Sequence, residues 1–135
     1  MRSDKILGLD YPWKIKSDFI LAIHPEVRNE LKRILGKSGS KNIIISQLKQ
    51  RIDYLEEYKN NCAFHKQWFE NYKTIDWLYA VRVKSKDLNL RIYFSFIENH
   101  AIFLHAFVEK SKSDLERAKS VATERYNLIK NSEEM

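Results

Sequence analysis

The sequence predicts an α+β domain in which two helices, a small antiparallel sheet and a last helix follow one another along 135 residues. Between Trp77 and Lys110, three runs rich in β-branched and aromatic residues are separated by turn-sized polar gaps, a pattern typical of consecutive strands. On both sides of this region apolar residues recur at three- and four-residue spacing, the period of an amphipathic helix. The length favours a single domain over residues 1–135, with residues 1–12 and 131–135 loosely ordered.

The N-terminal half predicts a first strand and then two helices. The strand is expected within residues 13–23, because the apolar run there stops at His24-Pro25. Proline suits the first turn of a helix, where its missing N–H costs nothing, so a helix is expected from Pro25 to about residue 35, before Gly36. A second helix is expected over residues 41–58, where one apolar stripe is formed by Ile44, Leu48, Ile52 and Leu55.

The C-terminal half predicts three strands and a helix. The strands are expected at residues 77–84, 89–98 and 100–109, after a structured connector that ends at residue 76. The first two helices should cover one apolar face of the sheet. That face is expected to carry Leu90, Ile92, Phe94 and Phe96 beside Ile102, Leu104, Ala106 and Val108. The last helix should begin at a capping box, with Ser113 as N-cap and Glu116 as its N3 partner.

The other face of the sheet is expected to be basic. Period-2 alternation places Arg82 and Lys84 on one face of their strand, and Arg91, Tyr93 and Ser95 on one face of the next strand. The net charge of +6 and the isoelectric point of about 9.4 agree with a polyanionic partner such as RNA or DNA. A basic balance also serves solubility.

Several other classes of protein fit the sequence poorly. Cys62 is the single cysteine, so an internal disulfide is excluded and a reducing compartment is favoured. The histidines lack the spacing of zinc ligands, and no metal or cofactor is expected. The start has no apolar core of a signal peptide and no run reaches membrane-spanning length, so a soluble, cytoplasmic protein is expected.

The order of these elements and four short segments resemble the RelE-like toxins of type II toxin–antitoxin systems. The branch that contains HigB and the phage Gp49-like proteins is the most similar. The resemblance is carried by Val81-Arg82-Val83, by Leu90-Arg91-Ile92-Tyr93-Phe94, by Phe103 to Lys110, and by a helix with Ala118 and Arg125-Tyr126. It departs from the family where a paired lysine is replaced by Glu109-Lys110, and in the length of the connector at residues 58–76.

The resemblance implies a toxin that cleaves mRNA, typically on the translating ribosome, and that a small antitoxin protein holds inactive. The 2′-hydroxyl of the RNA would attack the adjacent phosphate, without a metal ion. The implied catalytic residues are Arg91 as phosphate clamp, with Arg82, Lys84 and His105. The implied RNA contacts are Lys110, Lys112, Tyr93, Arg125 and Tyr126.

Several of these residues also have an ordinary structural interpretation. Arg91 and Lys84 could be solvated strand residues, His105 lies between Phe103 and Phe107 and could be a core histidine, and Tyr126 has the spacing of a core position. Two alternative functions remain open. One is a ParE-like toxin that inhibits DNA gyrase, and the other is a non-catalytic module that binds RNA or a protein.

Overall fold

The computed structural model describes residues 20–86, 88–97 and 100–134. A five-stranded sheet of order β1-β5-β4-β3-β2 forms its centre. The elements are β1 (Ile20–Ile23), α1 (Pro25–Gly36), α2 (Lys41–Tyr58), the 3-10 helix η1 (Lys59–Phe64), β2 (Phe69–Asn71), β3 (Tyr79–Lys84), β4 (Asn89–Ile97), β5 (His100–Val108) and α3 (Lys112–Glu134). The predicted α+β class and the order of elements are therefore confirmed.

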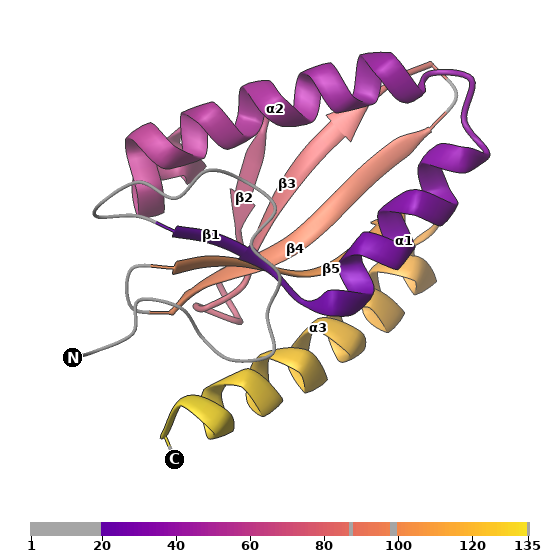
Figure 1. Cartoon of the computed structure of the whole chain (residues 1–135). Helices are drawn as coiled ribbons and strands as arrows, with labels where there is room; N and C mark the ends of the chain where they lie inside the picture. The colour runs from indigo at the N-terminus through magenta and orange to yellow at the C-terminus, as the bar shows by residue number, and fades with distance from the viewer. Residues whose placement is uncertain (1–19, 87, 98–99, 135) are drawn as a thin grey trace.

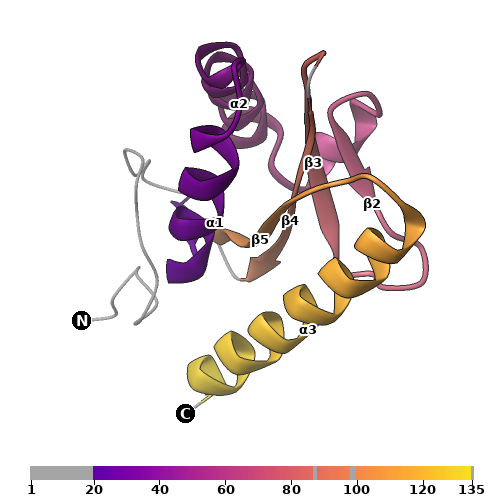
Figure 2. The ribbon, with the colours of Figure 1, turned by 90° about the vertical axis from the view of Figure 1, so that its right-hand side faces the viewer.

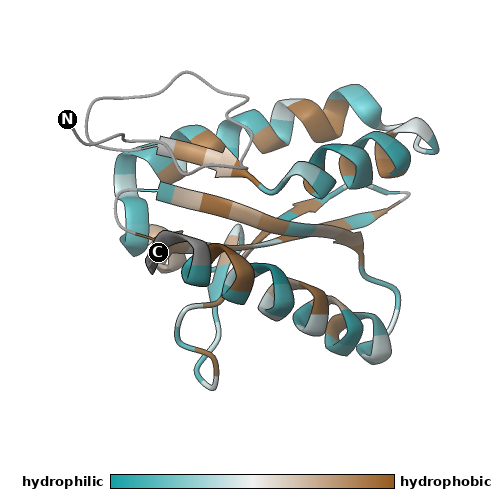
Figure 3. Ribbon diagram, turned by 60° about the horizontal axis from the view of Figure 1, so that its bottom comes forward, coloured by the Kyte–Doolittle hydropathy of each residue, from teal (hydrophilic) through white to brown (hydrophobic). Residues whose placement is uncertain are grey.

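The helices cover both faces of the sheet. Strands β2 to β5 are antiparallel to their neighbours, whereas β1 lies parallel to β5 at the sheet edge. Helices α1 and α2 pack on one face and α3 crosses the other (Figure 1; the view of Figure 2 separates the layers). The chain thus has three layers. In Figure 3 the strands are largely hydrophobic in colour and the outer turns of the helices largely hydrophilic.

Each face of the sheet has its own hydrophobic core. The α1/α2 side buries the helix stripe that the spacing predicted, together with Leu90, Ile92, Phe94 and Phe103. The α3 side buries Ala118 and Ala122 of the helix against Ala80, Tyr93, Ile97, Ile102 and Leu104. The face that was expected to be basic is therefore apolar where α3 covers it.

A register shift in β5 corrects the predicted faces. Tyr93 pairs with His105 while Phe94 pairs with Phe103, so Leu104 has no partner of its own across the ladder. An extra residue of this kind shifts the alternation of the strand that carries it. Ile102 and Leu104 consequently face α3, and Ala106 faces α1 and α2. The expectation that all three share the face of Leu90 was wrong.

The ends of α3 also differ from the prediction. The helix begins at Lys112, and its cap is shifted by two residues: the Asp114 carboxylate accepts the N–H of Ser111 at 2.9 Å and that of Lys110 at 2.8 Å. Ser113 therefore lies inside the helix, and the capping pair is Ser111 with Asp114. The helix continues to Glu134, so the chain is helical through most of the expected loose end. Residues 13–19 of the expected first strand lie outside the described residues.

No helix in the described ranges combines the length and the apolarity that crossing a membrane requires.

Candidate active site

Arg82 and Arg91 stand directly opposite each other on β3 and β4. Val81 and Val83 are buried in the α1/α2 core, so alternation directs the Arg82 side chain to the face that carries α3. Arg91 projects to the same face between the buried residues Leu90 and Ile92. The two guanidinium groups therefore meet on one face of the sheet, as the sequence predicted.

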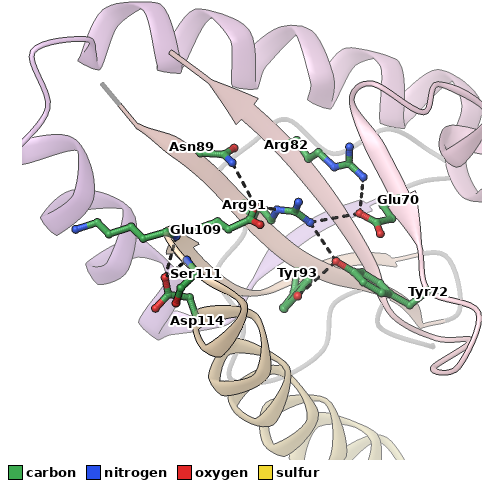
Figure 4. A network of polar contacts seen from close by, with 10 residues as sticks. Glu70, Tyr72, Arg82, Asn89, Arg91, Tyr93, Glu109, Ser111 and Asp114 are labelled. Carbon is green, nitrogen blue, oxygen red and sulfur yellow. Dashed lines mark hydrogen bonds and ion pairs between the residues drawn. The ribbon is translucent and has the colours of Figure 1, made fainter. Parts of the chain in front are cut away.

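A glutamate from the edge strand joins the two arginines. In Figure 4, Glu70 of β2 lies between them. One carboxylate oxygen of Glu70 accepts a hydrogen bond from Arg82 and another, at 3.3 Å, from Arg91. Phe69 is buried on the α1/α2 side, so its neighbour Glu70 is directed to the opposite face. The short edge strand thus places one carboxylate against both cations.

A second glutamate binds Arg91 from the other side. Glu109, at the end of β5, accepts a hydrogen bond from the Arg91 Nε at 2.5 Å and one from the Asn89 side-chain amide at 3.2 Å (Figure 4). The Arg91 side chain is 14% exposed and that of Glu109 is 22% exposed. Burial acts to lower the pKa of the Arg91 guanidinium, but Tyr72, Glu109 and Glu70 outweigh it and raise that pKa. Arg91 is therefore a fixed, permanently charged group.

Two tyrosine hydroxyls complete the site. The Tyr72 hydroxyl accepts a hydrogen bond from Arg91 at 3.3 Å and lies 3.4 Å from the Tyr93 hydroxyl. Burial raises the pKa of Tyr72 and, together with the hydrogen bond to Tyr72, raises that of Tyr93 further. Both phenols are therefore protonated at neutral pH and can donate a proton. Tyr93 is fully buried, so the direct RNA contact expected for it does not fit this conformation.

We call this group the sheet-face cluster. It consists of Glu70, Tyr72, Arg82, Arg91 and Glu109. Its two arginines and two glutamates cancel in formal charge, whereas the sequence predicted a basic face without these glutamates. The buried Nε of Arg82 has no hydrogen-bond partner among the described residues, so the cluster retains a donor for a further acceptor.

Glu70 and Tyr72 were not predicted from the sequence, because both lie in the connector. The connector is held in place by Arg51 of α2, which donates to the Arg82 carbonyl at 3.0 Å and lies 4.5 Å from the Trp68 ring centre. The sequence signal that could have indicated Glu70 is an acidic residue directly after an apolar aromatic one, as in Phe69-Glu70. Glu109 had been noted only as a departure from a paired lysine.

The structure places His105 and Arg125 in a different cluster. Glu30 of α1, which is 6% exposed, accepts hydrogen bonds from the His105 Nδ1 at 2.8 Å and from the Arg125 guanidinium at 3.1 Å. Two further bonds go to the backbone of β5: Glu30 accepts the Ala106 N–H at 3.1 Å, and Arg125 donates to the Leu104 carbonyl at 2.8 Å. We call Glu30, His105 and Arg125 the edge cluster.

The edge cluster closes β5 where β1 ends. The pairing of β1 with β5 ends at Phe103, which lies opposite Ile23. The N–H of His24, the next residue, donates to the Phe103 carbonyl at 2.9 Å. The next outward-facing backbone groups of β5 are those that Glu30 and Arg125 satisfy. The interpretation of His105 as a satisfied, partly buried residue therefore agrees with its contacts, and no contact joins it to Arg91.

The other predicted residues lie around the sheet-face cluster or away from it. Lys84, Lys110 and Lys112 are exposed and form no ion pair within the described part of the chain. Tyr126 stacks on Trp77, with 3.9 Å between ring centres and 6° between ring planes. Its ring face is therefore already occupied on one side.

Two further groups bear on the chemistry. Cys62 is fully buried, and burial raises the pKa of its thiol to about 12, so it is no nucleophile at neutral pH. Within residues 20–86, 88–97 and 100–134, no cluster of three or more His, Cys, Asp or Glu side chains could hold a metal ion.

Comparison with known proteins identifies no relative. No family model matches the chain, and neither a curated protein nor a solved structure matches it.

Proposed function

We propose that the protein is an endoribonuclease that cleaves mRNA at the sheet-face cluster and thereby blocks translation, as the toxin of a toxin–antitoxin pair. The observation that carries the proposal is the convergence of two arginines, a carboxylate and a protonated tyrosine from three neighbouring strands or their ends. The sequence resemblance supplies the substrate class, and the geometry supplies groups of suitable chemistry.

The proposed reaction is transfer of the phosphate to the neighbouring 2′-oxygen. The 2′-oxygen forms a bond to phosphorus as the bond to the 5′-oxygen breaks, which leaves a 2′,3′-cyclic phosphate and a 5′-hydroxyl. A base must take the proton of the 2′-hydroxyl, and an acid must protonate the departing 5′-oxygen. No oxidant, metal ion or cofactor enters this balance.

The residues of the cluster can fill these roles. Arg91 and Arg82 stabilise the charge that develops on the phosphate, because a guanidinium matches two phosphate oxygens at once. Glu70, which is one-third exposed and bonded to both arginines, is the carboxylate best placed to accept the proton. Tyr72 remains protonated, so it can donate to the leaving oxygen. Lys84, which is exposed near the end of β3, remains a second candidate for the base.

Binding of RNA requires an exchange of partners at Arg91. In the free protein the Arg91 Nε donates to Glu109. A phosphate that binds this guanidinium with two oxygens would need the same N–H. A phosphate must therefore displace Glu109 or share Arg91 with it. An acidic antitoxin segment would meet the same basic surroundings, including the exposed Lys110 and Lys112.

The proposal is tested by incubating purified protein with mRNA, with and without ribosomes, in the presence of a chelator. Cleavage with a cyclic phosphate at the new 3′-end is expected, and Arg91→Ala should slow it strongly. Expression of the wild type in cells should arrest growth, whereas Arg91→Ala should relieve the arrest. Intact RNA in every condition, with a folded protein, would contradict the proposal.

A non-catalytic RNA-binding module is the second candidate. It is favoured by one observation, namely that both arginines of the cluster are already paired with glutamates in the free protein. The same assay separates the two functions, because such a module would bind RNA and leave it intact. Inhibition of gyrase supercoiling, measured in parallel, tests the ParE-like alternative.

A further inference from the structure

A pocket of about 320 Å³ lies on the α1 side of the sheet, away from the sheet-face cluster. It lies between the end of α1, Leu88 just before β4, and the end of β5. Its aliphatic wall consists of Ile34, Leu88 and Val108, and its polar rim consists of Arg33, Lys37, Ser38 and Lys110. The volume lies at the lower end of the range of about 300–1,000 Å³ that is usual for small-ligand sites.

Among the described residues, the rim of this pocket carries three cations and no acid. Arg33, Lys37 and Lys110 are all exposed, and within the described ranges none of them forms an ion pair with a carboxylate. This differs from the sheet-face cluster, where each arginine has a glutamate partner. Three unpaired cations around an aliphatic wall fit a ligand that combines anionic groups with a flat or bulky uncharged part.

The pocket and the proposed active site lie on opposite faces of the sheet, and the end of β5 contributes to both. Lys110 follows Glu109, the residue that binds Arg91, and Val108 pairs with Leu90 next to Arg91. A single extended polyanion that contacts Arg91 on one side of the β5 end can therefore reach Lys110 and then the pocket. A small anion or a partner confined to the pocket would not use this shared end of β5.

We propose that the pocket is a second subsite for single-stranded RNA, which receives one base on its aliphatic wall while Arg33, Lys37 and Lys110 contact the flanking phosphates. This inference rests on the proposed function, because it extends the same substrate beyond the point of cleavage. The subsite supplies affinity and no chemistry. It makes binding depend on RNA length and on salt.

The test measures binding separately from cleavage. The probes are fluorescein-labelled single-stranded RNAs of about four and about twelve nucleotides, lengths that span the usual range of single-strand sites. All their sugars carry 2′-O-methyl groups, which prevents attack by the 2′-oxygen. The variant is Arg33→Gln with Lys37→Gln and Lys110→Gln. The matched control removes three exposed lysines outside the pocket, with Lys41→Gln, Lys49→Gln and Lys66→Gln.

At moderate salt, the pocket variant should bind the longer RNA at least about tenfold more weakly than the control. For the pocket variant, the slope of log K against log salt should also be smaller by about 2, or ~0.7 for each lost phosphate contact. The short RNA should bind both variants equally. With cleavable RNA of the longer length, KM should rise and kcat should stay unchanged. Circular dichroism and melting curves verify that both variants fold.

Three outcomes would count against one of the two proposals. Equal affinities and salt slopes for the pocket variant and the control would overturn the subsite. Unchanged RNA binding with a lost affinity for a helical Glu/Leu-rich peptide would also overturn it, and would assign the pocket to an acidic protein partner. Length- and charge-dependent binding of RNA without cleavage of ordinary RNA would overturn the proposed function and uphold the pocket.

Discussion

The sheet-face cluster and the edge cluster both contain arginine and glutamate side chains, but these side chains have different hydrogen-bond partners in the two clusters. In the edge cluster, Glu30 accepts a hydrogen bond from the Ala106 N–H of β5, and Arg125 donates one to the Leu104 carbonyl of the same strand. In the sheet-face cluster, every hydrogen bond of the Arg82 and Arg91 guanidinium groups goes to another side chain. Backbone groups that lose their partners inside a protein cost free energy.

This difference indicates which arginine can act on a ligand. Side-chain partners can rotate away when a phosphate arrives, because water or the phosphate replaces them. If the partners of Arg125 were replaced, backbone groups at the edge of β5 would lose their hydrogen bonds. Arg91 therefore belongs to a site that can exchange partners, whereas Arg125 belongs to the structure that holds α1, β5 and α3 together.

The largest expected effect separates the two arginines by activity. Arg91→Ala should lower the rate of RNA cleavage by about 10²–10³-fold, the range seen when one group that stabilises a developing oxyanion is removed. Arg125→Ala should leave the rate per folded molecule within a few-fold of the wild type. Single-turnover cleavage, normalised to the folded fraction, measures both. An Arg125→Ala protein that is folded and as inactive as Arg91→Ala would place the edge cluster in the active site.

The next effect separates the clusters by stability. Glu30→Ala should lower the free energy of unfolding by about 3 kcal/mol, because it removes the carboxylate that pairs with the charge of Arg125 and leaves the Ala106 N–H buried without an acceptor. Glu26→Ala, an exposed position one turn earlier on α1, should cost under about 1 kcal/mol. Urea denaturation of the three proteins gives the comparison. Equal midpoints for the two variants would show that the edge cluster contributes little.

A smaller effect appears in the pH dependence of stability. Burial acts to raise the pKa of Glu30, but hydrogen bonds from His105 and Ala106 and the charge of Arg125 lower it below its ordinary value of 4.5. A carboxyl whose pKa is lower in the folded state stabilises that state above the unfolded value, and this contribution fades as the pH falls through the folded value. The stability difference between the wild type and Glu30→Gln should therefore shrink on acidification below about pH 4.5. A difference that stays constant down to acid pH would contradict this assignment.

The sequence predicted what local spacing determines, and it failed where the fold combines distant residues. Helical and strand periods located α1, α2 and β3 to β5, and the cations Arg82 and Arg91 were placed on a common face. Glu30 and Arg125 are ninety-five residues apart along the chain, and no local pattern in either segment indicates that they meet. The extra residue at Leu104 depends on the pairing of two strands, so alternation within one strand could not reveal it.

The smallest expected effect tests whether Glu109 restrains the site. Glu109→Gln keeps the shape of the side chain but removes the charge that binds Arg91 in the free protein. RNA then no longer competes with a carboxylate for this guanidinium, so the affinity for 2′-O-methyl RNA should rise by a few-fold, about 1 kcal/mol or less for a partly exposed pair. Asn89→Ala, which removes only the neutral contact to Glu109, should leave the affinity nearly unchanged. Fluorescence anisotropy of the labelled RNA measures both variants. A fall in affinity for Glu109→Gln would mean that Glu109 holds Arg91 in the position that binds RNA. The partners of Arg91 would then have a structural role, as they do for Arg125 in the edge cluster.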